Sequence, residues 1–290
     1  MKLLARIDAY EKLVRLDKPI GSLLLMWPTL WALWWSSHGR PDWTVVWMFM
    51  LGAVLMRSAG CAINDYADRN FDGQVRRTRE RPLAAGIIRP REALAVAGVL
   101  SALAFSLVWQ FNWLTIKLSF FALAITIVYP FSKRFFSLPQ AILGVAFGFG
   151  IPMAFAAHLD QIPTMAWWLL LANVFWAIAY DTEYAMVDRE DDRKIGIRTS
   201  AILFGRFDVI AVMGSYAAFL LTLAGVGLKF GGGWYYWLGL AVAGVLVVWQ
   251  YRMIRARNPD ECFRAFRHNS WIGAVVFAGI VAHFRLPALH

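Results

Sequence analysis

The chain has 290 residues, 59% of them hydrophobic and only 17% charged, with a mean hydropathy of +0.51. This composition excludes an ordinary soluble domain and a disordered chain. Several apolar runs are long enough to cross a hydrocarbon core, which takes about 20 residues. The net charge is +10, but the basic residues fall in loops between apolar runs, so no nucleic-acid partner is expected.

The pattern predicts an all-α polytopic membrane protein. Residues 2–18 place apolar side chains at helical spacing with Lys and Arg around them, which predicts an amphipathic helix on the membrane surface. Nine transmembrane helices are expected to follow, in a single membrane domain over residues 1–290. Their ranges are 20–37, 43–65, 92–110, 113–131, 138–158, 164–182, 207–228, 233–251 and 269–287.

The distribution of Lys and Arg predicts the orientation of these spans. Most basic residues fall in the N-terminal segment and in the loops after every second span, and few fall in the loops on the opposite side. Because basic loops stay in the cytoplasm, the N-terminus and the loops after spans 2 and 6 are predicted to be cytoplasmic, and the C-terminus periplasmic. No cleavable targeting peptide is recognised before the first span, which favours a bacterial inner membrane.

A first acidic cluster lies at the end of the second span. Asn64, Asp65, Asp68 and Asp72 share one face of a helix, where three carboxylates repel one another unless a cation neutralises them. Oxygen-only ligands favour Mg²⁺, which also binds substrate phosphates.

A second acidic cluster lies at the end of the sixth span. Asp181, Asp188 and Asp192 again share one helix face, whereas Glu183, Glu190 and Asp191 point elsewhere and are expected to take no part. Neither cluster is accompanied by closely spaced His or Cys residues, so zinc is not expected. Acidic groups within a membrane protein are costly, and two such clusters indicate a site where two Mg²⁺ ions clamp a diphosphate.

Basic residues are expected to complete this clamp. Arg57 lies inside an apolar span, seven residues before Asn64, and needs an anionic partner there. Lys133 and Arg134 follow the fourth span. The run from Arg76 to Arg81, which contains Arg77, is a further candidate, although basic loops also serve to orient a membrane protein.

The motifs resemble those of the UbiA superfamily of intramembrane prenyltransferases. The pattern Asn64-Asp65-x-x-Asp68-x-x-x-Asp72 with Arg81-Pro82-Leu83 resembles the first signature of that superfamily, and residues 180–192 resemble the second. The flanking segments resemble the branch that uses 4-hydroxybenzoate in ubiquinone synthesis. These segments are 17–21, 27–31, 151–156, 194–197 and 199–205.

The resemblance implies a nine-helix bundle whose cavity opens laterally to lipid, and two Mg²⁺ ions on the diphosphate of a polyprenyl substrate. By motif position, Asn64, Asp68 and Asp72 belong to the first metal group, and Asp181, Asp188 and Asp192 to the second. Asp65, on the same helix face as the first group, is a further candidate metal ligand. The candidate catalytic residues are Asp68, Asp72, Asp181, Asp188 and Asp192. Tyr129 and Lys133 match positions that contact the diphosphate. Arg57 matches a position at the polar end of the cavity, where it binds either the diphosphate or the acceptor's carboxylate, and Asp181 is a candidate to polarise the phenol.

The expected reaction is magnesium-dependent transfer of the prenyl group from polyprenyl diphosphate to the ring carbon ortho to the hydroxyl of 4-hydroxybenzoate. A first alternative is the same chemistry with a naphthoate or porphyrin-type acceptor. A second is a cation-coupled membrane transporter, against which the position of both clusters at span ends argues. A CDP-alcohol phosphotransferase would need a Gly-x-x-x-Asp-x-x-x-Asp pattern that the chain lacks.

Overall fold

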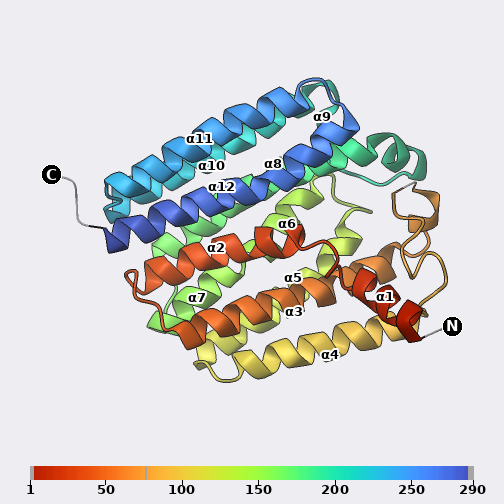
Figure 1. Ribbon diagram of the computed structural model, residues 1–290, viewed down its shortest axis with the longest axis horizontal. Coiled ribbons are helices and arrows are strands. Elements are labelled where there is room, and N and C mark those ends of the chain that lie inside the picture. The colour runs from red at the N-terminus through yellow and green to blue at the C-terminus, as the bar shows by residue number, and fades with distance from the viewer. Residues whose placement is uncertain (1–2, 76, 287–290) are drawn as a thin grey trace.

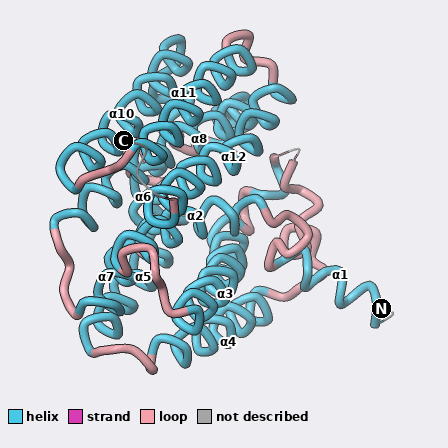
Figure 2. The backbone as a smooth tube through the Cα atoms, turned by 60° about the vertical axis from the view of Figure 1, so that its left-hand side comes forward, coloured by secondary structure: helices cyan, strands magenta, loops and turns pink. Residues whose placement is uncertain are grey.

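The computed structural model describes residues 3–75 and 77–286, and this part of the chain contains helices and loops but no strand (Figures 1 and 2). The predicted all-α class is confirmed. The helices are α1 (Leu3–Leu13), α2 (Ile20–Ser36), α3 (Trp43–Asp68), η1 (Asp72–Gln74), α4 (Pro90–Val108), α5 (Trp113–Ser132), α6 (Pro139–Gly148), α7 (Gly150–Leu159), α8 (Thr164–Ile195), α9 (Ser200–Phe204), η2 (Gly205–Phe207), α10 (Asp208–Phe230), α11 (Trp234–Ile254) and α12 (Pro259–Arg285).

The nine predicted spans fall on α2, α3, α4, α5, the α6–α7 pair, α8, α10, α11 and α12. Among the described residues, six segments are long and apolar enough to cross a membrane, judged by length and composition: α3, α4, α5, the α6–α7 pair, the α9–α10 segment and α11. Helix α2 has only 17 residues, and the charged ends of α8 and α12 lower their mean hydropathy.

Several boundaries differ from the predicted ones. Helix α12 begins at Pro259, ten residues before the predicted start of the ninth span at residue 269. Helix α8 continues to Ile195, far beyond the predicted end at residue 182, and so carries the whole second acidic motif. Helix α1 ends at Leu13, because Arg15 adopts a left-handed conformation with φ of 57°. The fifth span divides into α6 and α7 at Phe149, between Gly148 and Gly150, which pack so closely on Leu170 and Thr29 that a Cβ atom would collide.

Local sequence signals explain several helix starts. The side chains of Asp42, Asn112 and Asn258 accept hydrogen bonds from backbone N–H groups in the first turns of α3, α5 and α12. Proline occupies the first turn of α4, α6 and α12, where its missing N–H costs nothing. These signals fix where each helix begins at the ends of the bundle.

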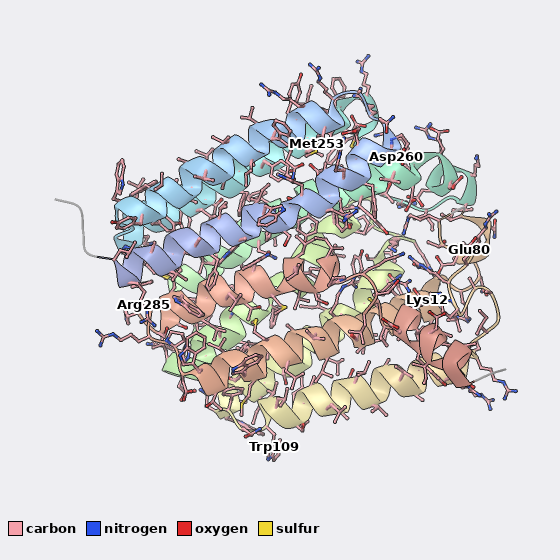
Figure 3. The ribbon with its side chains drawn as sticks, in the orientation of Figure 1. Lys12, Glu80, Trp109, Met253, Asp260 and Arg285 are labelled. Atoms are coloured by element: carbon pink, nitrogen blue, oxygen red, sulfur yellow. The ribbon has the colours of Figure 1, made fainter. Side chains whose placement is uncertain are left out.

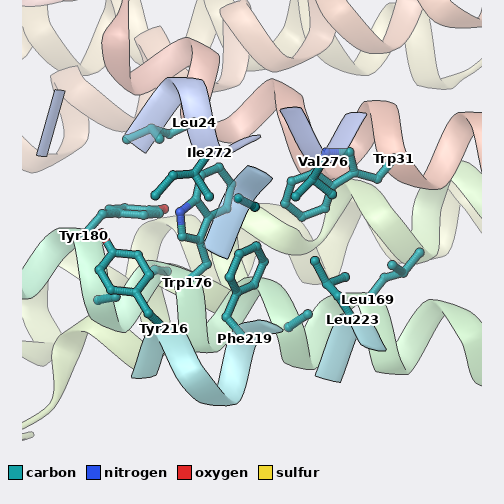
Figure 4. Packing of buried hydrophobic residues seen from close by; sticks show 14 of the residues in the cluster. Leu24, Trp31, Leu169, Trp176, Tyr180, Tyr216, Phe219, Leu223, Ile272 and Val276 are labelled. Atoms are coloured by element: carbon teal, nitrogen blue, oxygen red, sulfur yellow. The ribbon is translucent and has the colours of Figure 1, made fainter. Parts of the chain in front are cut away.

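The helices form two groups on either side of α2. Helices α8, α10, α11 and α12 lie together, and α3, α4 and α5 lie on the opposite side (Figure 1). Between α2 and the first group, the fully buried rings of Trp31, Trp176 and Phe219 form the centre of the core (Figure 4). The Trp176 and Phe219 rings stack with centroids 5.7 Å apart, and Trp31 lies 5.3 Å from Trp176.

A charged anchor joins three segments at the ends of α8, α10 and α11. Asp208, at the first position of α10, is 0% exposed. It pairs with Arg189 of α8 and accepts hydrogen bonds from Nε of Arg257, in the α11–α12 turn, at 3.0 and 3.2 Å. The two arginines offset the cost of burying this carboxylate.

We expect Asp208→Asn to lower the free energy of unfolding by about 3 kcal/mol or more, because two arginines lose their carboxylate while they stay partly buried. Thermal unfolding in detergent micelles measures the loss. Asp160→Asn, an exposed position in the α7–α8 turn, is the matched control and should leave the melting temperature unchanged. Equal melting temperatures for both variants would contradict this role of Asp208.

Candidate active site

One cavity of about 820 Å³ is lined by residues of α2, α3, α4, α5, α6, α7, α8 and α12. Helix α3 supplies a continuous wall, because its lining residues recur every three or four positions and so share one helix face. Lys12, Glu80 and Asp260, which line the mouth of the cavity, lie towards one end of the bundle, opposite Arg285 (Figure 3). The cavity is therefore charged at one end and apolar along the rest of its length.

The first acidic motif lies at the charged end, where each carboxylate has a basic partner. Asp65, 1% exposed, accepts hydrogen bonds from Arg15 at 2.9 and 3.1 Å and from Arg81 at 3.1 Å. Arg81 also donates to Asp72 at 3.0 and 3.1 Å. Arg81 therefore bridges the last turn of α3 and η1.

Asp68 faces a different part of the cavity from Asp65. It accepts a hydrogen bond from Nζ of Lys133 at 3.2 Å and another from Nδ2 of Asn64 at 3.2 Å. Nζ of Lys133 also lies 3.5 Å from Oδ1 of Asn64 and 5.7 Å from the ring centre of Tyr129. The four residues form one polar group at the ends of α3 and α5.

The second acidic motif faces the first across the cavity, because Asp181, Asp188 and Asp192 of α8 line the same space. Arg77 donates from Nε to both carboxylate oxygens of Asp188, at 3.0 and 3.1 Å, and its guanidinium lies over the ring of Tyr184, 4.5 Å from the centroid. The loop between η1 and α4 thus reaches from α3 to α8.

Arg57 lies between the charged end and the apolar part of the cavity. Its guanidinium carbon is 5.6 Å from the ring centre of Phe147, and its buried Nε has no hydrogen-bond partner in the structure. A buried guanidinium with an unused donor is suited to an anionic or polar ligand. Arg57 lines the cavity, as expected, and its part in binding a ligand stays a prediction.

Most of the predicted site residues line this cavity, but Arg134 does not. Its Nη2 donates to the carbonyl oxygen of Ala67 at 2.8 Å, and its guanidinium lies over the rings of Phe71 and Phe131, beside a smaller pocket of about 260 Å³. Arg76 lies outside the described residues.

The three acidic residues expected to take no part do not line the cavity, although Glu183 has an unexpected environment. It is 0% exposed and accepts hydrogen bonds from Tyr216 at 3.0 Å and Asn269 at 2.9 Å, which joins α8 to α10 and α12. Glu190 and Asp191 lie on the side of α8 away from the site, near Arg193 and Lys194.

Sequence reasoning missed several lining residues. Arg15 belongs to the N-terminal segment predicted to lie on the membrane surface, yet it reaches Asp65, fifty positions along the chain. Gln140, Tyr180 and Tyr184 also line the charged end of the cavity. Only Tyr180 and Tyr184 carried a signal, since both lie inside the second motif.

The donor chemistry of the site fits Mg²⁺, since the candidate ligands are carboxylate and amide oxygens on two facing helices. Within the described residues, no three acidic, His or Cys side chains converge tightly enough to enclose a metal ion by themselves. Phosphate oxygens of a substrate and water would supply the remaining ligands, as is usual for Mg²⁺.

These features define a multi-pass membrane protein with an enclosed site for an anionic substrate that has a long apolar part. The chain belongs to the UbiA prenyltransferase family, whose profile matches residues 25–272.

Named relatives and solved structures agree with this membership. The chain is 62% identical over 287 residues to a 4-hydroxybenzoate octaprenyltransferase of Thiobacillus denitrificans, covering 99% of this chain and 98% of that protein. It is 62% identical to the corresponding protein of Dechloromonas aromatica over 280 residues, with 96% and 95% coverage.

Among solved structures, the apo UbiA homolog of Aeropyrum pernix K1 superposes with a TM-score of 0.80 at 24% identity, covering 91% of this chain and 98% of that one. The UbiA homolog of Archaeoglobus fulgidus bound to GPP and Mg²⁺ gives a TM-score of 0.72 at 18% identity, with 96% and 100% coverage. At these identities the likeness concerns the fold.

The stability of the protein should depend on the ionisation of Asp192, which lies on α8 beyond the predicted span. Burial, and then the charge of Asp188, raises the pKa of Asp192 from 3.8 to about 7. Between these values the unfolded chain loses the proton and the folded protein keeps it, so stability falls as the pH rises. Asp192→Asn should therefore melt above wild type by a margin that grows from about pH 4 to about pH 7, where it levels off.

Differential scanning fluorimetry in detergent with a chelator present measures this margin across the pH range. Asp260→Asn is the control, since Asp260 is exposed in the first turn of α12. A margin independent of pH would contradict the assignment to Asp192.

Proposed function

We propose that this chain catalyses the transfer of a polyprenyl group from polyprenyl diphosphate to the ring carbon ortho to the hydroxyl of 4-hydroxybenzoate, with release of diphosphate, in ubiquinone synthesis. The observation that carries the proposal is a single cavity in which two acidic motifs and their basic partners lie at one end and an apolar wall continues from them. The names of relatives at about 62% identity support the choice of acceptor.

In this proposal the two motifs hold two Mg²⁺ ions together with the diphosphate. The ligands would be Asn64, Asp65, Asp68 and Asp72 from the first motif and Asp181, Asp188 and Asp192 from the second. When bound, the metal stabilises negative charge on the leaving diphosphate. Arg77, Arg81 and Lys133 supply further positive charge at the same place.

The remaining steps follow from the cavity walls. The carbon–oxygen bond of the prenyl diphosphate breaks, and its electron pair stays on the diphosphate. The allylic carbon then bonds to the ring carbon of the acceptor, and that ring carbon loses its proton to a carboxylate or water. Tyr129, Tyr180 and Phe147 surround this part of the cavity, where they exclude water and present ring faces to the cation.

The acceptor is placed between the diphosphate and Arg57. Arg57 binds the acceptor's carboxylate in this arrangement, and its free Nε donor supports a role in binding an anion. Asp181 lies on α8, where the positive charges of Lys133 and Arg57 act on its carboxylate. In this proposal Asp181 polarises the hydroxyl of the phenol. We propose that Arg134 does not contact the substrate. Its hydrogen bond to the carbonyl oxygen of Ala67 instead holds the end of α3 in place beside Lys133.

We place the protein in a bacterial inner membrane as a single membrane domain, with the charged cavity mouth and the N-terminus cytoplasmic and the C-terminus periplasmic. The distribution of Lys and Arg supports this orientation. The two described chain ends lie at opposite ends of the bundle, as this orientation requires (Figure 1). The lipid partner is the surrounding bilayer, into which the exposed apolar faces of the helices project.

Purified protein with 4-hydroxybenzoate, a long polyprenyl diphosphate and Mg²⁺ should form the ring-alkylated acid, detected by chromatography and mass spectrometry. Asp68→Ala and Asp188→Ala should each lower turnover about 100-fold or more, because both remove charge that holds the metal diphosphate. A chelator should stop the reaction. Wild-type turnover in either variant, or without divalent cations, would overturn the metal assignment.

Arg57→Met should separate acceptor binding from diphosphate binding. We expect the KM for 4-hydroxybenzoate to rise about 10- to 100-fold, since hydrogen bonds to charged groups contribute about 1.5–3 kcal/mol. The KM for the prenyl diphosphate should stay near the wild-type value. Lys117→Met, at an exposed position at the opposite end of α5 from Lys133, controls for loss of a basic residue. An unchanged KM for the acceptor would exclude this role of Arg57.

A panel of acceptors tests the nearest alternative. Product with a naphthoate or porphyrin-type acceptor, and none with 4-hydroxybenzoate, would retain the prenyl transfer and change the substrate. Cation flux in proteoliposomes without any prenyl product would favour a transporter.

A further inference from the structure

Residues 17–21, one of the segments that resemble the 4-hydroxybenzoate branch, lead into α2 and end at Gly21, the second residue of that helix. Gly21 is buried and lines the main cavity together with Leu24 and Leu25, which follow on the same side of α2. No group in the proposed reaction comes from this segment. The presence of a glycine on this part of the cavity wall therefore needs its own physical reason.

The backbone of α2 does not itself require glycine at position 21. Gly21 is not among the described glycines that have a positive φ, which are Gly39, Gly86, Gly196, Gly205 and Gly231. In an ordinary helical conformation glycine is less favourable than alanine, because it loses more conformational freedom on folding. The reason for glycine here therefore lies in the surroundings of the residue.

The side chain of Arg57 occupies the space that a side chain at position 21 would fill. A Cβ atom on Gly21 would lie 2.5 Å from Nε, 2.6 Å from Nη2 and 2.9 Å from Cζ of Arg57, whereas ordinary van der Waals contact begins at 3.4 Å. These three nearest atoms all belong to one guanidinium group. The group thus lies against the backbone of α2 at the one place where that backbone carries no side chain.

A third helix contributes to the position of the guanidinium. The ring centre of Phe147, in α6, lies 5.6 Å from Cζ of Arg57, which itself projects from α3. Neither Gly21 nor the ring of Phe147 accepts a hydrogen bond from the buried Nε, which has no partner in the structure. Contacts without hydrogen bonds therefore hold the guanidinium and leave this donor available to a ligand.

We infer that Gly21 is a positioning residue for acceptor binding, because the room that it leaves against α2 lets the Arg57 guanidinium lie where it receives the acceptor's carboxylate. A methyl group at position 21 would displace the guanidinium by about 1 Å, and a shift of this size is enough to weaken a contact that depends on the direction of the arginine fork. The inference rests on the proposed function, which assigns carboxylate binding to Arg57. It goes beyond that function by naming the residue that determines where Arg57 lies.

The test compares Gly21→Ala with the control Gly98→Ala. Gly98 is an exposed glycine of α4 with no atom within 4 Å of its Cβ position, and it does not line the cavity. Gly21→Ala should raise the KM for 4-hydroxybenzoate about 10-fold and leave the KM for the prenyl diphosphate near the wild-type value. Gly98→Ala should match wild type in both.

The melting temperature separates this effect from damage to the fold. Alanine favours a helix over glycine, and the atoms that must yield to the new methyl group belong to the flexible end of Arg57. Gly21→Ala should therefore melt no lower than wild type while it binds the acceptor more weakly. An unchanged acceptor KM in Gly21→Ala would overturn the inference.

The double variant Gly21→Ala/Arg57→Met shows whether the effect passes through Arg57. Its acceptor KM should equal that of Arg57→Met alone, because no guanidinium is left to displace. If Gly21→Ala raised the acceptor KM by the same factor in the wild-type and Arg57→Met backgrounds, the methyl group would act on the acceptor directly, and the inference would be wrong.

A readout without substrate distinguishes failure of this inference from failure of the proposed reaction. In protein labelled with ¹⁵N-arginine, the Nε–H resonance of Arg57 is identified by its absence in Arg57→Met. Because the guanidinium lies near the ring of Phe147, its chemical shift depends on where it lies. Gly21→Ala should shift this resonance, and Gly98→Ala should not. If wild type alkylates no acceptor, the proposed function fails, whereas an Arg57 resonance that is the same in wild type and Gly21→Ala overturns the placement of Arg57 by Gly21.

Discussion

The organisation of the site depends on the pairing of buried carboxylates with basic side chains from distant segments. Asp65 and Asp188 are held by Arg81 and Arg77, which come from the same loop between η1 and α4. Carboxylates removed from water are costly unless paired, so these pairs fix the loop against α3 and α8 at once. The mouth of the cavity is thereby built from a segment with little regular structure of its own.

The same helix, α3, determines how polarity changes along the cavity. Its lining face carries carboxylates in the last turns, Arg57 in the middle and apolar or small residues towards its start. A substrate with a charged head and a long apolar tail can match this sequence of environments in only one direction. Orientation of the substrate thus follows from the order of residues on one helix face.

The sequence predicted those features that helix geometry alone controls. The spacing of Asp181, Asp188 and Asp192 placed them on one face, and the structure places all three along the cavity, because α8 stays helical to Ile195. Arg134 shows that being adjacent to a site residue in the sequence does not predict a place in the site. It follows Lys133 directly, but both residues lie in the turn after α5, where adjacent side chains diverge, so one reaches Asp68 and the other the carbonyl of Ala67.

Contacts between distant segments could not be predicted in this way. Arg15 contacts Asp65 only because α1 ends at Leu13 and the chain turns back over α3. Glu183 is buried by partners on α10 and α12, whose approach to α8 depends on the packing of the whole bundle. In both cases the residue type was visible in the sequence, whereas its partner depended on tertiary structure.

The ion pairs also bear on how the proposed substrate would bind. Arg77, Arg81 and Lys133 neutralise Asp188, Asp72 and Asp68. A diphosphate that arrives with divalent cations brings charges of both signs, so the basic groups can turn to phosphate oxygens while the carboxylates turn to the cations. Neither set of charges is left unpaired in either state, which keeps the energetic cost of the exchange low. The pairing that stabilises the buried carboxylates therefore also prepares the cavity for a substrate of this composition.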